Sequence, residues 1–146
     1  MYLGDQLTND CTAAQKNRDA VKVGALRQLR SAFHNAEIAA RGKLDEAASI
    51  KFLQQQLRQR EESAAIFKQA GRLEQLVQEE QEANIIRSYL PPSLSTSELE
   101  VIAKQAVTEA GAKGFGAAMA WAMQQVKGQA TGQEVAAAIK KAMAEK

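Results

Sequence analysis

Cysteine, histidine and proline are almost absent from this sequence of 146 residues, which has one cysteine, one histidine and two prolines. A lone cysteine forms no internal disulfide, and Cys11 with His34 cannot supply the ligand set of a structural zinc site. Nucleophilic catalysis by this pair would also need an orienting third group and a pocket, which no motif indicates. The sequence therefore predicts no catalytic residues, no metal and no cofactor.

Aromatic residues and long apolar runs are scarce as well. Aromatics make up 5% of the chain, so stacking platforms for single-stranded nucleic acid are not expected. No apolar run approaches the roughly 20 residues of a membrane-spanning helix. The segment Met1–Asp5 lacks the basic and apolar regions of a signal peptide. We therefore expect a cytoplasmic protein that does not bind membranes.

Helix-forming residues dominate what remains, and the apolar residues recur at helical spacing along the whole chain. Asp19 and Asp45 are placed to cap helices, and Ser95–Glu98 and Thr131–Glu134 each have the spacing of a capping box. The sequence predicts an all-α fold without strands. The expected helices cover about residues 3–16, 19–41, 45–71, 73–88, 95–111, 115–128 and 131–142.

The spacing also predicts particular positions within these helices. Ile50 is expected on the apolar face of the third helix, and Phe115 and Met123 on that of the sixth. Gly42 is expected to end the second helix in a left-handed conformation.

Two adjacent prolines divide the chain. Pro91 and Pro92 lack amide donors and push their predecessors out of helical dihedrals, so the helix that contains Ser88 should end by Leu90. We expect a larger N-terminal domain of antiparallel helices over residues 1–90. A bend at 91–95 and a small three-helix C-terminal domain over 96–146 should follow.

The formal net charge is +2, but the charged residues are unevenly distributed along the chain. Residues 1–60 hold ten Lys/Arg against six Asp/Glu, residues 61–95 three against six, and residues 96–146 six against five. This is a smaller excess than dedicated nucleic-acid binders carry. It permits a basic face on the first half of the chain.

The second expected helix carries such a face. At 100° per residue, Arg27, Arg30, His34 and Arg41 fall within about 60° of one another, with Glu37 interrupting them. Further basic residues lie nearby in the sequence at Lys16, Arg18 and Lys22. One interpretation is a solvated face with ion pairs. The other is a strip that grips a nucleic-acid backbone through its phosphates.

Charges on the apolar stripes of the third and fourth helices predict a structural contact. Arg60 falls on one stripe, and Glu79 and Glu80 fall on the other. Because unpaired buried charges are costly, we expect a partly buried ion pair between Arg60 and one of these glutamates. The interpretation would be wrong if Arg60 lay more than about 6 Å from both carboxylates.

Five short motifs, in order, resemble the GatB/YqeY family. They are Leu26-Arg27-Gln28-Leu29-Arg30-Ser31-Ala32 with Asn35-Ala36-Glu37, Leu57-Arg58-Gln59-Arg60-Glu61-Glu62-Ser63, Tyr89-Leu90-Pro91, Ala110-Gly111-Ala112 with Gly116 and Met119, and Val126-Lys127-Gly128 with Gly132. The resemblance covers essentially the whole chain and fits a free-standing YqeY-like protein. It implies a larger helical N-terminal part followed by a three-helix C-terminal part.

The resemblance also implies a role near charged tRNA. In that family the same domain forms the tail of the B subunit of glutamine-dependent tRNA amidotransferases, which are carbon–nitrogen ligases, and is appended to some glutaminyl-tRNA synthetases. There it helps to hold tRNA while catalysis happens elsewhere. This chain departs from the family's Gly-Lys-x-Met and Lys-Gly-x-Ala-Asp-Gly patterns at Gly116–Met119 and Lys127–Gly132. The tail is therefore less cationic, and Lys127 is its main remaining positive charge.

Two function hypotheses follow. The first is a non-catalytic helical module that assists tRNA aminoacylation or amidation by binding tRNA or the synthetase machinery, with Arg27, Arg30, Arg41 and Lys127 on phosphates. The second is a protein-interaction adaptor without nucleic-acid binding, using a groove near Tyr89, Leu90 and Trp121. Enzymatic activity of the isolated chain ranks third, because no nucleophile or acid–base pair supports it.

Overall fold

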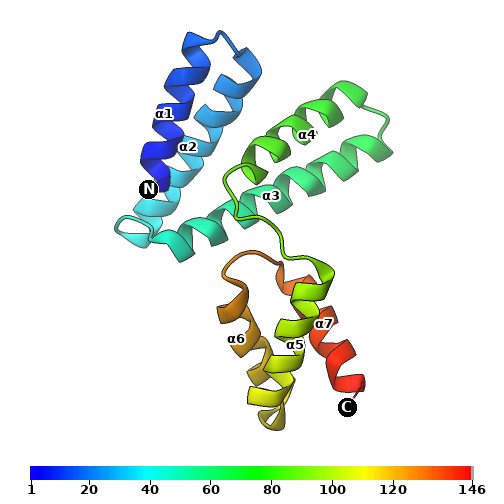
Figure 1. Cartoon of the computed structure of the whole chain (residues 1–146). Coiled ribbons are helices and arrows are strands. Elements are labelled where there is room, and N and C mark those ends of the chain that lie inside the picture. Colours follow the sequence, from blue (N-terminus) through cyan, green and yellow to red (C-terminus); the bar gives the residue numbers. More distant parts are fainter. Residues whose placement is uncertain (146) are drawn as a thin grey trace. The chain divides into compact units, whose positions relative to one another are not determined.

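In the computed structural model, which describes residues 1–145, helices form where the sequence provides caps and apolar periodicity, and no strand occurs among these residues (Figure 1). The helices are α1 (Leu3–Lys16), α2 (Ala20–Ala40), α3 (Glu46–Gln69), α4 (Leu73–Arg87), α5 (Thr96–Ala110), α6 (Phe115–Val126) and α7 (Gly132–Ala144), with a 3-10 turn, η1 (Gly111–Lys113), before α6. The all-α fold class predicted from the sequence is confirmed.

Side-chain caps start four of these helices. The Asp19 carboxylate accepts from Lys22 N at 3.1 Å, and the Asp45 carboxylate accepts from Ala48 N at 2.8 Å. Ser95 and Glu98 form the reciprocal capping box.

The second expected capping box, at the start of α7, forms only in part. Thr131 Oγ1 accepts from Glu134 N at 3.2 Å, but the Glu134 carboxylate contacts the Thr131 hydroxyl instead of the backbone. This leaves Ser95–Glu98 as the complete box of the two.

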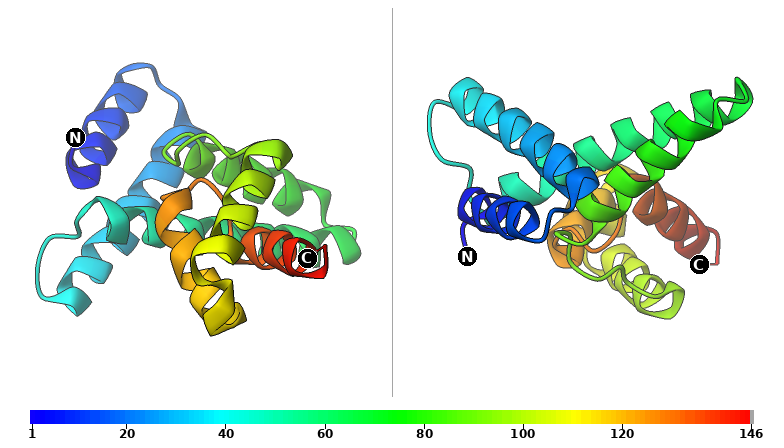
Figure 2. Two further views of the ribbon diagram at one scale, coloured as in Figure 1. Left: turned by 60° about the horizontal axis from the view of Figure 1, so that its bottom comes forward. Right: turned by 90° about the horizontal axis from the view of Figure 1, so that it is seen from above.

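The chain divides into two compact units, residues 1–90 and 91–146. The first unit contains two antiparallel hairpins, α1–α2 and α3–α4, which meet near the middle of α2 and diverge toward their tips (Figures 1 and 2). Phe33 of α2 joins them: its ring lies 5.3 Å from that of Phe52 on α3 and 5.8 Å from that of Tyr2, measured between centroids. Leu7, Leu26 and Leu53 fill the same core and are fully buried.

The second unit is built on small residues. Ala118, Ala122 and Val126 form the buried face of α6, and Val135 and Ile139 form that of α7. Alanines at i and i+4 let helices approach closely, but each buries little apolar area. A hydrogen bond of 2.8 Å from Leu94 N to Gln129 O ties the start of this unit to the α6–α7 loop.

Two inward faces expected from the sequence are wrong in part. Phe115 and Met123, which the spacing places on the apolar face of α6, are 37% and 39% exposed. The alanines of α6 occupy the interface instead, because the neighbouring helices lie too close for larger side chains. On α3, Phe52 is buried, whereas Ile50, which the spacing places on the apolar face, is only half-buried.

The ends of the hairpin helices also differ from expectation. The left-handed residue after α2 is Arg41, with φ of 59°, rather than Gly42. Gly42 N bonds Glu37 O and Arg41 N bonds Ile38 O, which is the hydrogen-bond pattern of a Schellman turn. Arg18, with φ of 56°, holds the same position after α1, and Gly71 holds it after α3.

Candidate nucleic-acid interface

The α1–α2 hairpin presents the arginine row of α2 to solvent. Arg27, Arg30 and His34 are exposed and lie on one side of α2, while Leu26, Leu29 and Phe33 are buried on the other. The three polar side chains line a groove of about 610 Å³ together with Tyr2, Asp5 and Thr8 from the α1 side and with Glu37 of α2. The structure thus brings together three of the four side chains that the helical spacing had grouped.

Glu37, which interrupts the row in sequence, lines the same groove, but its carboxylate bonds to Tyr2 and Leu44. The Tyr2 hydroxyl donates to its two carboxylate oxygens at 2.6 and 2.5 Å, and Leu44 N donates to Oε2 at 2.9 Å. The hydrogen bond from Tyr2 holds the pKa of the Glu37 carboxyl below its usual range. The same bond raises the pKa of Tyr2 to about 12. Glu37 is therefore an ionised anchor for Tyr2 and Leu44, not a partner of the arginines.

The basic side chains of this hairpin lack carboxylate partners. Across residues 1–145, no Asp or Glu carboxylate forms an ion pair with Arg27, Arg30 or Arg41. By contrast, Arg87 pairs with Glu61 at 3.1 Å. The unpaired arginines keep their hydrogen-bond donors available, and Arg forks bind phosphate oxygens in a bidentate manner.

Additional cations extend the basic face to both ends of the hairpin. Lys16, Arg18 and Lys22 are exposed around the α1–α2 turn, and Arg41 follows the far end of α2. A helix of this length spans about 30 Å. Lys43 places its ammonium 4.9 Å from the Tyr2 ring centroid, a cation–π contact that the sequence did not suggest.

Lys127 belongs to the second unit, where it ends α6 with φ of 48°. It is exposed, and within the described residues no carboxylate pairs with it.

The residues proposed for a partner groove have structural contacts within their own units. The Tyr89 hydroxyl donates to Asp10, and burial together with this bond raises the pKa of Tyr89 above its ordinary value. Leu90 packs against the core of the first unit. Trp121 is half-buried against the core of the second unit.

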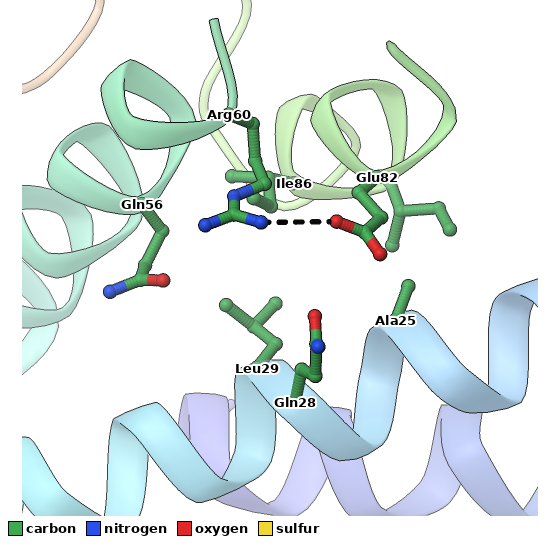
Figure 3. Close-up of a pocket in the computed structure, with 8 residues that line it drawn as sticks. Ala25, Gln28, Leu29, Gln56, Arg60, Glu82 and Ile86 are labelled. Atoms are coloured by element: carbon green, nitrogen blue, oxygen red, sulfur yellow. Dashed lines mark hydrogen bonds and ion pairs between the residues drawn. The ribbon is translucent and has the colours of Figure 1, made fainter. Parts of the chain in front are cut away.

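The expected ion pair on the α3–α4 hairpin involves two carboxylates. Arg60 Nη1 lies 3.1 Å from Glu79 Oε2. It also lies 3.3 Å from Glu82 Oε2, and Figure 3 shows this second pair. Glu80 is exposed. Glu82, which the sequence does not predict as a partner, is the more deeply buried of the two carboxylates. Glu79 Oε2 is shielded from water and receives no hydrogen bond. Burial accordingly raises the pKa of Glu79, against the opposing effect of Arg60.

The described part of the chain has neither a candidate metal cluster nor a helix that could span a membrane. No three His, Cys, Asp or Glu side chains gather there in a way that could hold a metal ion. None of those helices combines the length and hydrophobicity that crossing a bilayer requires. Cys11 is buried in the first core and His34 is exposed.

Together, the helical hairpins and their unpaired arginine face define an all-helical protein with a candidate anion-binding surface. The family model described as Yqey-like protein matches residues 4–143, so the chain belongs to the YqeY family. The family predicted from the sequence motifs is confirmed. No curated protein matches the chain.

Proposed function

We propose that this protein is a non-catalytic tRNA-binding module that acts in the cytoplasm and assists tRNA aminoacylation or amidation. The observation that carries the proposal is the row of unpaired cations on the α1–α2 hairpin of a YqeY-family chain. The tRNA itself is suggested by the resemblance to the tails of tRNA amidotransferase B subunits. Contacts to phosphates would position the RNA without reading its sequence.

The backbone at Arg18 and Arg41 supports a role for these cations beyond folding. Both occupy left-handed positions that glycine fills more easily, as Gly71 does after α3. A left-handed conformation costs a side-chain-bearing residue about 1–2 kcal/mol. Strained residues of this kind are often kept for function. Lys127 is a third cation with this conformation.

The test compares two triple variants of equal net charge. The first changes Arg27, Arg30 and Arg41 to Gln. The matched control changes Lys51, Arg58 and Lys68, three exposed cations of α3, to Gln. Binding of purified tRNA is measured by fluorescence anisotropy near physiological salt, with circular dichroism to confirm folding.

The proposal expects the α2 variant to bind at least about tenfold more weakly, because each phosphate contact contributes on the order of 1 kcal/mol. The α3 control should bind like the unchanged protein. Equal losses in the two variants would mean that only net charge matters. Failure of the unchanged protein to bind tRNA, or amidation of tRNA by the purified chain alone, would contradict the proposal.

A further inference from the structure

A second groove runs between α2 and α4 and shares no lining residue with the groove of the arginine row. It consists of two adjoining hollows of about 340 and 270 Å³, which share Ala25, Gln28 and Glu82. Figure 3 shows the inner hollow, where Gln28 and Leu29 of α2 point toward Arg60 and Glu82 without closing the space between them. The groove is therefore an open surface feature of the first unit.

The outer part of the groove carries apolar side chains that nothing in the unit covers. Val21 of α2 is 50% exposed and Val77 of α4 is 51% exposed, and both line the outer hollow. Leu73, four residues before Val77 on the same face of α4, is 68% exposed. α4 thus has a second apolar side in addition to its buried face of Ala83 and Ile86.

Gly24 lies in this groove and has no packing reason to be glycine. It lies within the 21-residue helix α2, where glycine is the least favourable residue after proline. A Cβ added to Gly24 would meet nothing within 4 Å, so α2 could carry alanine there without a clash. Glycine at such a position lets the backbone of another segment approach closely.

The charge of the groove restricts what approaches. Glu74 and Glu82 line the outer hollow, and no Lys or Arg does. Arg60, at the inner end, already faces the two carboxylates of Glu79 and Glu82. The groove is therefore negative, which suits a positively charged partner.

We propose that the α2–α4 groove docks a short amphipathic helix of a partner protein, with a small aliphatic face flanked by Lys or Arg. The lining residues of α2, from 20 to 29, extend over about 14 Å, or between two and three turns of a docked helix. A contact of this size is small for a permanent complex and fits a reversible one of micromolar affinity. The aliphatic face packs over Gly24, Val21 and Val77.

The probe is a synthetic helical peptide of about 15 residues with a Leu/Ala face and flanking lysines, beside a twin with glutamates for the lysines. The blocking variant is Gly24→Leu, which fills the groove and remains helix-compatible. The matched control is Gly116→Leu in α6, where an added Cβ also meets nothing within 4 Å. Circular dichroism checks that both variants are folded.

The expected result is micromolar binding of the lysine peptide and at least about tenfold weaker binding of its glutamate twin. Gly24→Leu should lower the affinity for the lysine peptide at least about tenfold, and Gly116→Leu should leave this affinity unchanged. Absence of binding, or equal effects of the two variants, would overturn the proposal. Self-association in sedimentation that Gly24→Leu abolishes would assign the groove to a second copy instead.

Binding of tRNA by Gly24→Leu separates this proposal from the proposed function. It should be unchanged, because Gly24 lines the α2–α4 groove and does not line the groove of the arginine row. A loss of tRNA affinity in this variant would assign the groove to nucleic acid and overturn the protein-docking proposal.

Discussion

Replacing Arg60 with Met tests how the α3–α4 hairpin is stabilised. Arg60 is the cation between Glu79 and Glu82, with side-chain exposures of 25%, 14% and 10%. Methionine keeps an aliphatic stem of similar length, so the change removes mainly the guanidinium. Two carboxylates then face each other in a partly buried site without a counter-charge.

The expected loss can be bounded from the exposures. Removing one partner of a fully buried ion pair costs about 3–5 kcal/mol, and an exposed pair contributes about 0.2–1 kcal/mol. Since water still reaches a quarter of Arg60, we expect Arg60→Met to lower the free energy of unfolding by about 2–3 kcal/mol at pH 7.

The loss should depend on pH. Burial already raises the pKa of Glu79, and loss of Arg60 raises it further. A carboxyl whose folded-state pKa lies above its unfolded value destabilises the fold when ionised, and this penalty disappears as pH falls below the unfolded value of about 4.3. The stability difference between Arg60→Met and the unchanged protein should therefore shrink toward pH 4.

Urea unfolding at pH 7 and pH 4 measures both effects, with Arg87→Met as the control. Arg87 pairs with Glu61 at the same 3.1 Å, but the two side chains are 49% and 52% exposed, so the loss should stay below about 1 kcal/mol. Adding Glu79→Gln to Arg60→Met should restore part of the stability. Equal losses for the two arginines, or a loss independent of pH, would refute the reasoning.

Two further substitutions test the basic hairpin. Arg41→Gly should raise the free energy of unfolding by about 0.5–1 kcal/mol, because glycine adopts the left-handed backbone at φ of 59° without strain. Urea unfolding and tRNA anisotropy on one preparation should show higher stability together with weaker tRNA binding. A loss of stability would contradict the assignment of the turn. Tyr2→Phe should cost about 1 kcal/mol near pH 7, because Glu37 loses the hydrogen bond that lowers its pKa. This contribution exists above the ordinary Glu pKa and is lost as pH falls through the lowered folded value, so unfolding of Tyr2→Phe should match the unchanged protein in acid.

Local chemistry explains why the helices were predictable from the sequence. Asp19, Asp45 and Ser95 each cap the helix expected after them, and the chain leaves α4 just before Pro91 and Pro92. Each of these features depends only on residues within one helical turn of one another, so they can be recognised from the sequence without knowing the fold. The grouping of Arg27, Arg30 and His34 follows from helical periodicity in the same way.

Contacts between distant residues were not predictable. Glu37 interrupts the arginines in sequence, and the structure alone shows that its carboxylate bonds the hydroxyl of Tyr2, 35 residues away. Glu82 joins Arg60 because α3 and α4 pair in one particular register. The exposure of Met123 depends on how closely α6 approaches its neighbours, which the alanine positions suggest only once the bundle is known.

The salt dependence of tRNA binding tests the central claim most directly. The logarithm of the association constant is plotted against the logarithm of the salt concentration for the unchanged protein and for the variant with Arg27, Arg30 and Arg41 changed to Gln. Each phosphate contact contributes about 0.7–0.9 to the magnitude of the slope, so the slope measured for the variant should be smaller in magnitude by about 2–3. Identical slopes, or no binding by the unchanged protein near physiological salt, would contradict the account.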